Sequence, residues 1–173
     1  MPNWCQNYVS VSHEDPEMMK KFAQGVKEGN LFETLVPLPT KDGVWDYGTA
    51  VEYWGTKWDV TNGDFYTEED GMSGSGSFDT AWGPGIAAYD KLTELGFEVD
   101  ATYLETGMSF AGHYSSEGGD ECYEYDFDDE NWRDDIDDDD VLEMLESEYE
   151  SWKEWQDEME DDEDEEDKPQ DEA

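Results

Sequence analysis

Cationic side chains are scarce in this chain. Its 173 residues include nine lysines and arginines against 50 aspartates and glutamates, which gives a formal net charge of −41. A charge of this sign and size repels nucleic acids and anionic membranes over a Debye length or more. We therefore expect no direct binding to nucleic acid and no membrane partner.

Cysteines and long hydrophobic runs are scarce as well. Cys5 and Cys122 lack the spacing of metal ligands, and we expect two free thiols rather than a disulfide. No stretch reaches the roughly 20 apolar residues that a membrane helix needs. The N-terminus "MPNWCQNYVSVSH" lacks the basic and apolar regions of a signal peptide. These absences predict a cytoplasmic protein.

The acidic residues are distributed unevenly. Residues 1–119 hold 20 acids and six lysines, whereas residues 120–173 hold 30 acids and three cations. The first part also carries five of the eight tryptophans and has hydrophobic runs at regular intervals, and about 120 residues can bury an ordinary core. We predict a globular domain over 1–119, an acidic extension over 120–160 and a disordered acidic tail over 161–173.

Strand and helix patterns alternate in the globular part. "NWCQNYVSVS" predicts a strand, and "DPEMMKKFAQGVKEGN" predicts a helix that Asp15 caps and Gly29 ends. "LFETLVPLPT" is expected to form a buried crossing loop. A short helix after it should end at Gly55. "TKWDV" and "SFDTAWG" predict two strands joined by a long glycine- and serine-rich loop, and Pro84 should open a second helix. "FEVDATYLET" and "MSFAGHYSS" predict a hairpin around Gly107, and "ECYEYDF" predicts a further strand.

This order of elements is β-α-(short α)-β-β-α-β-β. Two helices separated by a strand hairpin, with one strand before and one after, form the split βαβ pattern of ferredoxin-like domains. We therefore predict an α+β fold with an antiparallel sheet that carries both main helices on one face and extra C-terminal strands. The acidic extension follows this domain.

Five sequence blocks carry a resemblance to a known family. "MPNWCQN", "LFETLVPLP", "WGTKWDV", "FDTAWGP" and "YLETGMSFAG" resemble the signature blocks of the YubB-like family, in the right order over roughly residues 1–115. The resemblance implies a ferredoxin-like domain encoded by a bacteriophage or a conjugative plasmid, and it implies no activity. After the tryptophan of "TAW", relatives often have Ser-Pro-Pro, whereas this chain has Gly83-Pro84-Gly85.

Tryptophans mark one region of the globular part. Trp54, Trp58 and Trp82 frame the predicted strand pair, with Lys57 beside them. One interpretation is an aromatic platform that stacks on a base or on a partner side chain. The other is a tryptophan-rich core, which we favour because the nearby charges do not suit a nucleic-acid groove. We therefore expect Trp4, Trp54, Trp58 and Trp82 to be structural, with Trp58 buried against the two main helices.

The remaining motifs do not indicate catalysis. "GMSGSGS" lacks the Gly-Lys-Ser/Thr ending of a P-loop, and we expect a flexible loop there. His13 or His113 could act as a general acid or base with Glu105 or Asp79, but no nucleophile or oxyanion donor accompanies them. We expect no enzyme, and no catalytic residue, cofactor or metal site.

The extension contains the spacing of a calcium-binding loop. Four acidic residues fall at positions 1, 3, 5 and 12 of such a loop: Asp135, Asp137, Asp139 and Glu146. The sixth position should be glycine but is Asp140, and a helical pattern already begins at Val141. We expect weak, nonspecific divalent binding rather than an EF-hand.

An amphipathic pattern follows. Apolar side chains recur at helical spacing at Val141, Leu145, Tyr149, Trp152 and Trp155, which predicts a helix over about 141–156. Its other faces are almost all carboxylate, and like charges four residues apart destabilise an isolated helix. The helix should therefore form only when its apolar stripe docks on the domain or on a partner. The alternative is a solvated acidic tail that only maintains solubility.

Charge and the implied origin together favour a protein-binding function. Carboxylates spaced like DNA phosphates would compete for the basic groove of a host nucleic-acid-binding or defence protein, in the cytoplasm of an infected or plasmid-bearing bacterium. Two alternatives stay open: an enzyme or nucleotide-binding module at the Trp54/Trp58/Trp82 region, and a non-inhibitory accessory or structural phage protein. The expected acidic surface consists of Asp134, Asp135, Asp137, Asp138, Asp139, Asp140, Glu143, Glu146 and Glu150.

Overall fold

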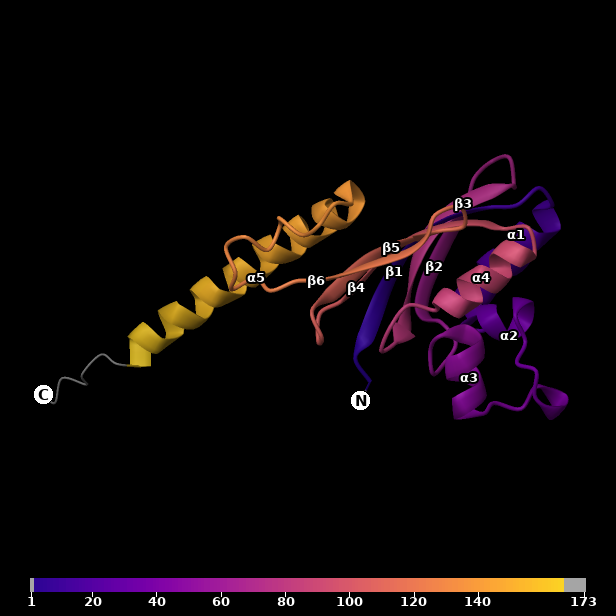
Figure 1. Cartoon of the computed structure of the whole chain (residues 1–173), viewed down its shortest axis with the longest axis horizontal. Helices are drawn as coiled ribbons and strands as arrows, with labels where there is room; N and C mark the ends of the chain where they lie inside the picture. Colours follow the sequence, from indigo (N-terminus) through magenta and orange to yellow (C-terminus); the bar gives the residue numbers. More distant parts are fainter. Residues whose placement is uncertain (1, 167–173) are drawn as a thin grey trace, which may run out of the picture. The chain divides into compact units, whose positions relative to one another are not determined.

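The structure, a computed structural model, describes residues 2–166 (Figure 1). The chain divides into two compact units, Met1–Asp126 and Phe127–Ala173. The positions of these units relative to one another are not determined.

The first unit is built on a six-stranded antiparallel sheet. The strands are β1 (Trp4–Ser12), β2 (Thr61–Thr67), β3 (Ser73–Ala81), β4 (Glu98–Glu105), β5 (Phe110–Ser115) and β6 (Gly119–Glu124). Their order in the sheet is β2-β3-β1-β4-β5-β6, and each neighbouring pair is antiparallel. The predicted α+β class with an antiparallel sheet is confirmed, and the order is compatible with a ferredoxin-like fold.

Helices α1 (Pro16–Glu28) and α4 (Ile86–Glu94) pack their apolar sides against the sheet (Figure 1). Helix α1 begins where the sequence predicts it, because the Asp15 carboxylate accepts a hydrogen bond from the backbone N–H of Glu17. It ends at Gly29, whose φ of 72° suits glycine. Every second residue of β1 is buried, and the core formed in this way includes Val9, Val11, Met19, Phe22, Leu92 and Val99.

The connection from α1 to β2 differs from the prediction. "LFETLVPLPT" begins as a short helix, α2 (Leu31–Leu35), because the Asp59 carboxylate accepts hydrogen bonds from the backbone N–H groups of Phe32 and Glu33. Burial of Asp59 raises the pKa of its carboxyl group. "TKWDV" is therefore not a strand: its aspartate holds the start of α2, and β2 begins only at Thr61.

The rest of this connection contains a short 3-10 turn, Lys41–Gly43, and helix α3 (Tyr47–Trp54). The Asp46 carboxylate caps α3 by accepting the backbone N–H of Thr49, and Gly55 ends the helix with a φ of 81°. The predicted short helix that ends at Gly55 is thus confirmed.

The glycine- and serine-rich segment is not a flexible loop. Residues 73–77 of this segment form the first part of β3, which pairs with both β1 and β2. A Cβ atom on Gly74 would lie 2.6 Å from Cε1 of Phe65, so the aromatic ring on the neighbouring strand leaves space only for glycine. The predicted loop is wrong because these glycines serve close packing.

Strand β6 is the edge strand of the sheet on the side opposite β2. It pairs with β5 along its whole length, from Ser115 opposite Gly119 to Phe110 opposite Glu124. The first unit extends to Asp126, whereas the expected boundary after residue 119 would cut β6 after its first residue.

The second unit contains helix α5 (Asp139–Glu166). This helix covers the predicted range 141–156 and extends beyond it at both ends. It includes residues 161–166, for which we expected disorder, while 167–173 lie outside the described residues. Neither α5 nor any other helix in the described part of the chain combines the length and the apolar composition needed to cross a membrane.

Candidate functional site

Five large aromatic side chains are exposed and close together in the first unit. We call this cluster the aromatic patch, and it consists of Trp4, Trp45, Tyr47, Trp58 and Trp82. Their exposed fractions range from 37% for Trp58 to 49% for Tyr47. Grouped exposed aromatic residues mark interaction sites, because tryptophan and tyrosine contribute most of the binding energy at many interfaces.

Lys57 lies at the centre of the patch. Its Nζ atom is 4.4 Å from the ring centroid of Trp58, 5.0 Å from that of Trp82 and 5.8 Å from that of Tyr47. A cation at this distance is attracted to the electron-rich ring face. The Trp4 and Trp58 ring centroids are 6.1 Å apart, and those of Tyr47 and Trp82 are 6.4 Å apart. The patch is therefore continuous, with one positive charge among its rings.

Trp82 has a backbone conformation that a bulky residue rarely adopts. Its φ is 68°, in the left-handed region that favours glycine. Two buried threonines hold the turn: the Thr56 hydroxyl donates to the carbonyl of Ala81 at 2.9 Å. The Thr80 hydroxyl donates to the carbonyl of Gly83 at 2.7 Å. The surrounding structure thus keeps an unfavourable conformation that exposes the indole, which is typical of functional positions.

The four tryptophans expected to be structural have different environments. Trp54 is 4% exposed and donates its indole N–H to the carbonyl of Val36 at 2.7 Å. Trp58 is 37% exposed, so the prediction that it is buried against the main helices is wrong. Because residues 57–60 form no strand, no sheet face directs Trp58 into the core. Trp4 and Trp82 are exposed as well and belong to the aromatic patch.

Sequence reasoning missed two members of the patch, Trp45 and Tyr47. They flank Asp46, which caps α3, and so stand where a loop enters a helix rather than on an apolar stripe. The pattern of two aromatic residues on either side of a capping aspartate could have indicated that both side chains are exposed. The Trp45 indole donates to the carbonyl of Lys57 at 2.9 Å, which joins the loop before α3 to the loop after it.

The two histidines have identifiable partners. Nδ1 of His13 accepts the backbone N–H of Asp15, so its Nε2 carries the proton and donates to the carbonyl of Leu95 at 2.9 Å. This imidazole ties the end of β1 to the end of α4. His113 lies 2.9 Å from the carboxylate of Asp100 on the neighbouring strand.

Glu105 and the two cysteines are not arranged for catalysis either. The carboxylate of Glu105 accepts the backbone N–H groups of Gly107 and Met108 in the β4–β5 turn. Cys5 and Cys122 are free thiols, as predicted. Burial raises the pKa of Cys5, and partial desolvation raises that of the more exposed Cys122. A raised thiol pKa lowers the thiolate population and disfavours nucleophilic chemistry.

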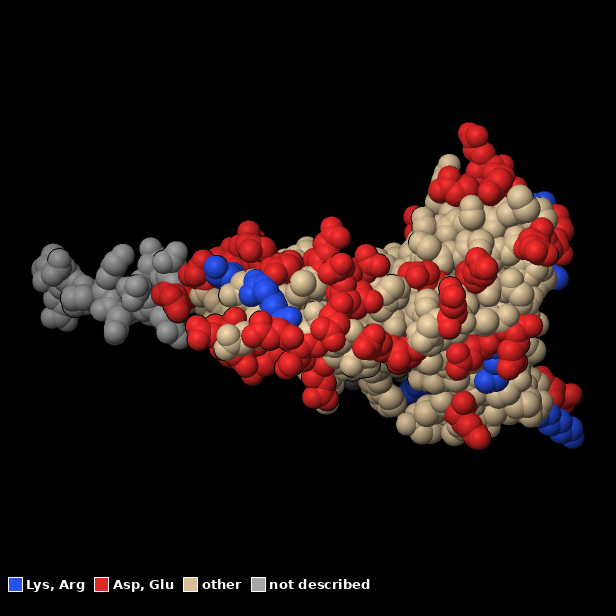
Figure 2. All heavy atoms as spheres, turned by 45° about the horizontal axis from the view of Figure 1, so that its top comes forward, with Lys and Arg blue, Asp and Glu red and all other residues tan. Residues whose placement is uncertain are grey.

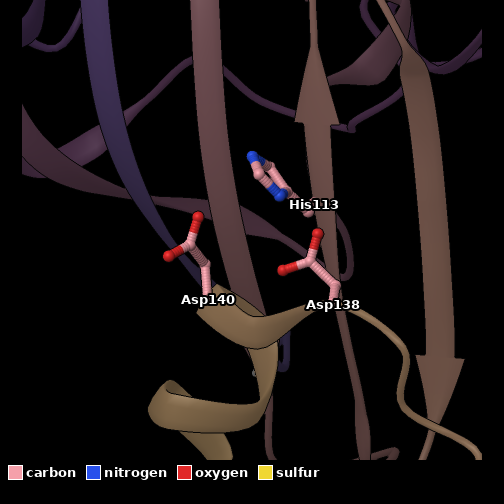
Figure 3. Close-up of side chains that lie close together, drawn as sticks. All are labelled: His113, Asp138 and Asp140. Carbon is pink, nitrogen blue, oxygen red and sulfur yellow. The ribbon is translucent and has the colours of Figure 1, made fainter.

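Figure 3 shows the side chains of His113, Asp138 and Asp140. His113 belongs to β5 of the first unit, whereas both aspartates belong to the second unit. Because the relative positions of the units are not determined, these side chains define no metal site.

Four aromatic rings hold the second unit together, and we call them the aromatic cluster: Phe127, Trp132, Tyr149 and Trp152. Phe127 lies 5.1 Å from Trp132, and Tyr149 stacks on Trp152 at 5.7 Å, measured between ring centroids. The guanidinium carbon of Arg133 lies 4.2 Å from the centroid of Trp132. The cluster joins the segment before α5 to the helix itself.

The apolar stripe of α5 is shorter than predicted. Val141 and Leu145 are buried, and Tyr149 and Trp152 belong to the aromatic cluster. Trp155, the last predicted member, is 54% exposed and lies outside this packing.

The predicted acidic surface lies in this unit. Seven of its nine carboxylates are exposed: Asp134, Asp135, Asp137, Asp139, Asp140, Glu143 and Glu150. Asp138 is half-buried and accepts the backbone N–H of Val141 at 3.0 Å. Glu146 forms an ion pair with Arg133, whose Nη2 donates to Oε2 at 2.8 Å, and this hydrogen bond lowers the pKa of Glu146. Glu146 therefore has a structural contact, and no EF-hand loop forms because α5 has already begun at Asp139.

Comparison of the chain with protein-family models, with curated proteins and with solved structures produced no match.

Proposed function

We propose that this protein is an acidic protein-binding module that occupies the basic groove of a host nucleic-acid-binding or defence protein in place of DNA. The charge density of α5 supports the proposal. Sixteen acidic residues and one lysine give this 28-residue helix a net charge of −15. At about 1.5 Å per residue the helix is about 42 Å long, or about one net negative charge per 2.8 Å. Duplex DNA carries one per about 1.7 Å, and each of its strands one per about 3.4 Å.

The order of this helix also supports mimicry. A solvated tail would present its carboxylates in no fixed arrangement, whereas the aromatic cluster and the Arg133–Glu146 pair fix part of α5. Acidic side chains far outnumber basic ones on the face drawn in Figure 2. An ordered array of this kind can meet a basic groove with little loss of conformational entropy.

The proposal includes an origin and a finer description of the fold. We assign the first unit to the split βαβ type of ferredoxin-like domain, with β2-β3-β1-β4 as its sheet and β5 and β6 as additional strands. This assignment agrees with the five sequence blocks that resemble the YubB-like family of phage and plasmid proteins. A mobile element gains from a protein that keeps host defence nucleases away from its DNA, which makes the bacterial cytoplasm the place of action.

The test is capture of host proteins on immobilised full-length protein. We expect DNA-binding proteins, identified by mass spectrometry, to be retained at low salt, released at high salt and displaced by duplex DNA. Retention that does not depend on salt, or that duplex DNA does not displace, would contradict mimicry.

A pair of charge-matched variants separates the helix from overall charge. One variant changes four exposed acids of α5 to glutamine: Glu143, Glu150, Glu154 and Glu158. The other changes four exposed acids of the first unit: Glu28, Glu52, Glu94 and Glu117. We expect the first variant to lose far more affinity than the second. Equal losses would mean that net charge, and not the arrangement on α5, attracts the partner.

A further inference from the structure

We propose that the aromatic patch is a second binding site, which takes an extended proline-rich segment of a partner protein with arginine or lysine beside its prolines. This site lies in the first unit and is independent of the acidic helix. The argument rests on the hydrogen-bonding groups, the charge and the fixed geometry of the patch.

The side chains of the patch are rich in hydrogen-bond donors. Indole and ammonium groups donate and do not accept, and Tyr47 supplies the only hydroxyl of the set. Among the described residues, the indole N–H groups of Trp4, Trp58 and Trp82 have no acceptor within the chain, unlike that of Trp45. A matching ligand must offer acceptors and few donors. A proline-rich segment does so, because proline has no backbone N–H and a polyproline II helix leaves its carbonyl oxygens unpaired.

The ring arrangement suits the same ligand. The Trp4 and Trp58 ring planes are inclined at 39° and those of Tyr47 and Trp82 at 75°, so the patch presents both faces and edges of rings. Aromatic surfaces of this kind bind polyproline II segments, whose preformed conformation reduces the entropy lost on binding. The two threonines that bond to the carbonyls of Ala81 and Gly83 fix the backbone on either side of Trp82 before the ligand arrives.

Charge disfavours the other ligands that stack on indoles. Residues 1–126 contain 24 acids and six lysines, a net charge of −18, which repels nucleotides and single-stranded nucleic acid despite the presence of Lys57. The positive charge of Lys57 would repel a ligand whose own cation had to lie among the same rings. A neutral run of prolines avoids both penalties, and flanking arginines or lysines are attracted to the net negative charge of the first unit.

Isothermal titration of the full chain with two synthetic peptides tests this site. One peptide has a run of prolines followed by two arginines, and the other has the same arginines after alternating glycine and serine. We expect the proline peptide to bind roughly tenfold or more tightly, as hot-spot contacts imply. Equal affinity for the two peptides, or no binding of the proline peptide, would overturn the proposal.

Variants of the patch complete the test. Trp82→Ala should remove the preference for proline, and Trp82→Gly should remove it as well while suiting the left-handed backbone, so a folding defect cannot explain the loss. Trp155→Ala, which removes an exposed tryptophan outside the patch, should leave the preference unchanged. A preference that survives both Trp82 variants would overturn the site.

A single-stranded oligonucleotide provides the competing outcome. If it bound more tightly than the proline peptide and lost this binding in Trp82→Gly, the patch would bind nucleobases and the proposal would be wrong. Failure here would leave the proposed role of α5 untouched, because the glutamine variants of that helix probe different residues.

Discussion

The two units are both acidic, but different interactions hold them together. In the first, a six-stranded sheet and two helices bury a large core of aliphatic and aromatic residues, and the acids lie around it. In the second, four aromatic rings and the Arg133–Glu146 ion pair organise a long helix that carries sixteen acidic residues and one lysine. Like charges four residues apart destabilise such a helix. The comparison shows that a few large rings can order a segment whose charge alone would keep it unfolded.

The largest effect should come from the core of the first unit. Trp54→Ala removes a buried ring and its hydrogen bond to Val36, and it should cost about 3–5 kcal/mol in the free energy of unfolding. Urea titration measures this value, with Trp155→Ala as the control that removes an equally large but exposed ring. Similar midpoints for the two variants would contradict the assigned role of Trp54.

The aromatic cluster of the second unit should show a smaller effect. Tyr149 contacts Phe127, Trp132 and Trp152, with ring centroids 5.3 to 5.7 Å apart. Tyr149→Ala should destabilise this unit by about 2 kcal/mol and lower the helical signal in far-UV circular dichroism. Trp155→Ala on the same helix should not lower the signal. An unchanged signal in Tyr149→Ala would mean that the cluster does not hold α5.

The strain at Trp82 can be measured from two variants that both lose the ring. Trp82→Gly should be about 1 kcal/mol more stable than Trp82→Ala, because only alanine retains the cost of a left-handed backbone. Thermal or urea unfolding of the pair gives the difference directly. Equal stability would show that the turn relaxes once the indole is removed.

The smallest effect should be the pH dependence of the Arg133–Glu146 pair. Its hydrogen bond lowers the pKa of Glu146 in the folded state, so the stabilisation is present above the ordinary glutamate pKa of about 4.3 and is lost as pH falls through the lowered value. Glu146→Gln should be less stable than the unaltered chain by at most about 1 kcal/mol at pH 7, and this difference should vanish in acid. Glu143→Gln, which removes an exposed charge from the same helix, should not destabilise at pH 7.

Elements with local signals could be predicted from the sequence. Helix α1 has its cap at Asp15 and its stop at Gly29 within its own segment, and α3 has the same pair of signals at Asp46 and Gly55. The short segment "TKWDV" could not be predicted in this way, since Asp59 bonds to the backbone of Phe32, 27 residues away. Alternation over five residues does not reveal a contact that the rest of the fold creates.

The sequence by itself determined the net charge of −41, the two ends of α1 and the apolar stripe of α5 as far as Trp152, because these depend on composition or on neighbours along the chain. The tertiary structure alone decided which tryptophans are buried. Trp4, Trp58 and Trp82 come from three separate segments, and their exposure depends on how those segments pack. Burial of a side chain is set by neighbours distant in sequence. For that reason the tryptophan-rich sequence predicted a core, whereas three of these tryptophans lie on the surface of the folded domain.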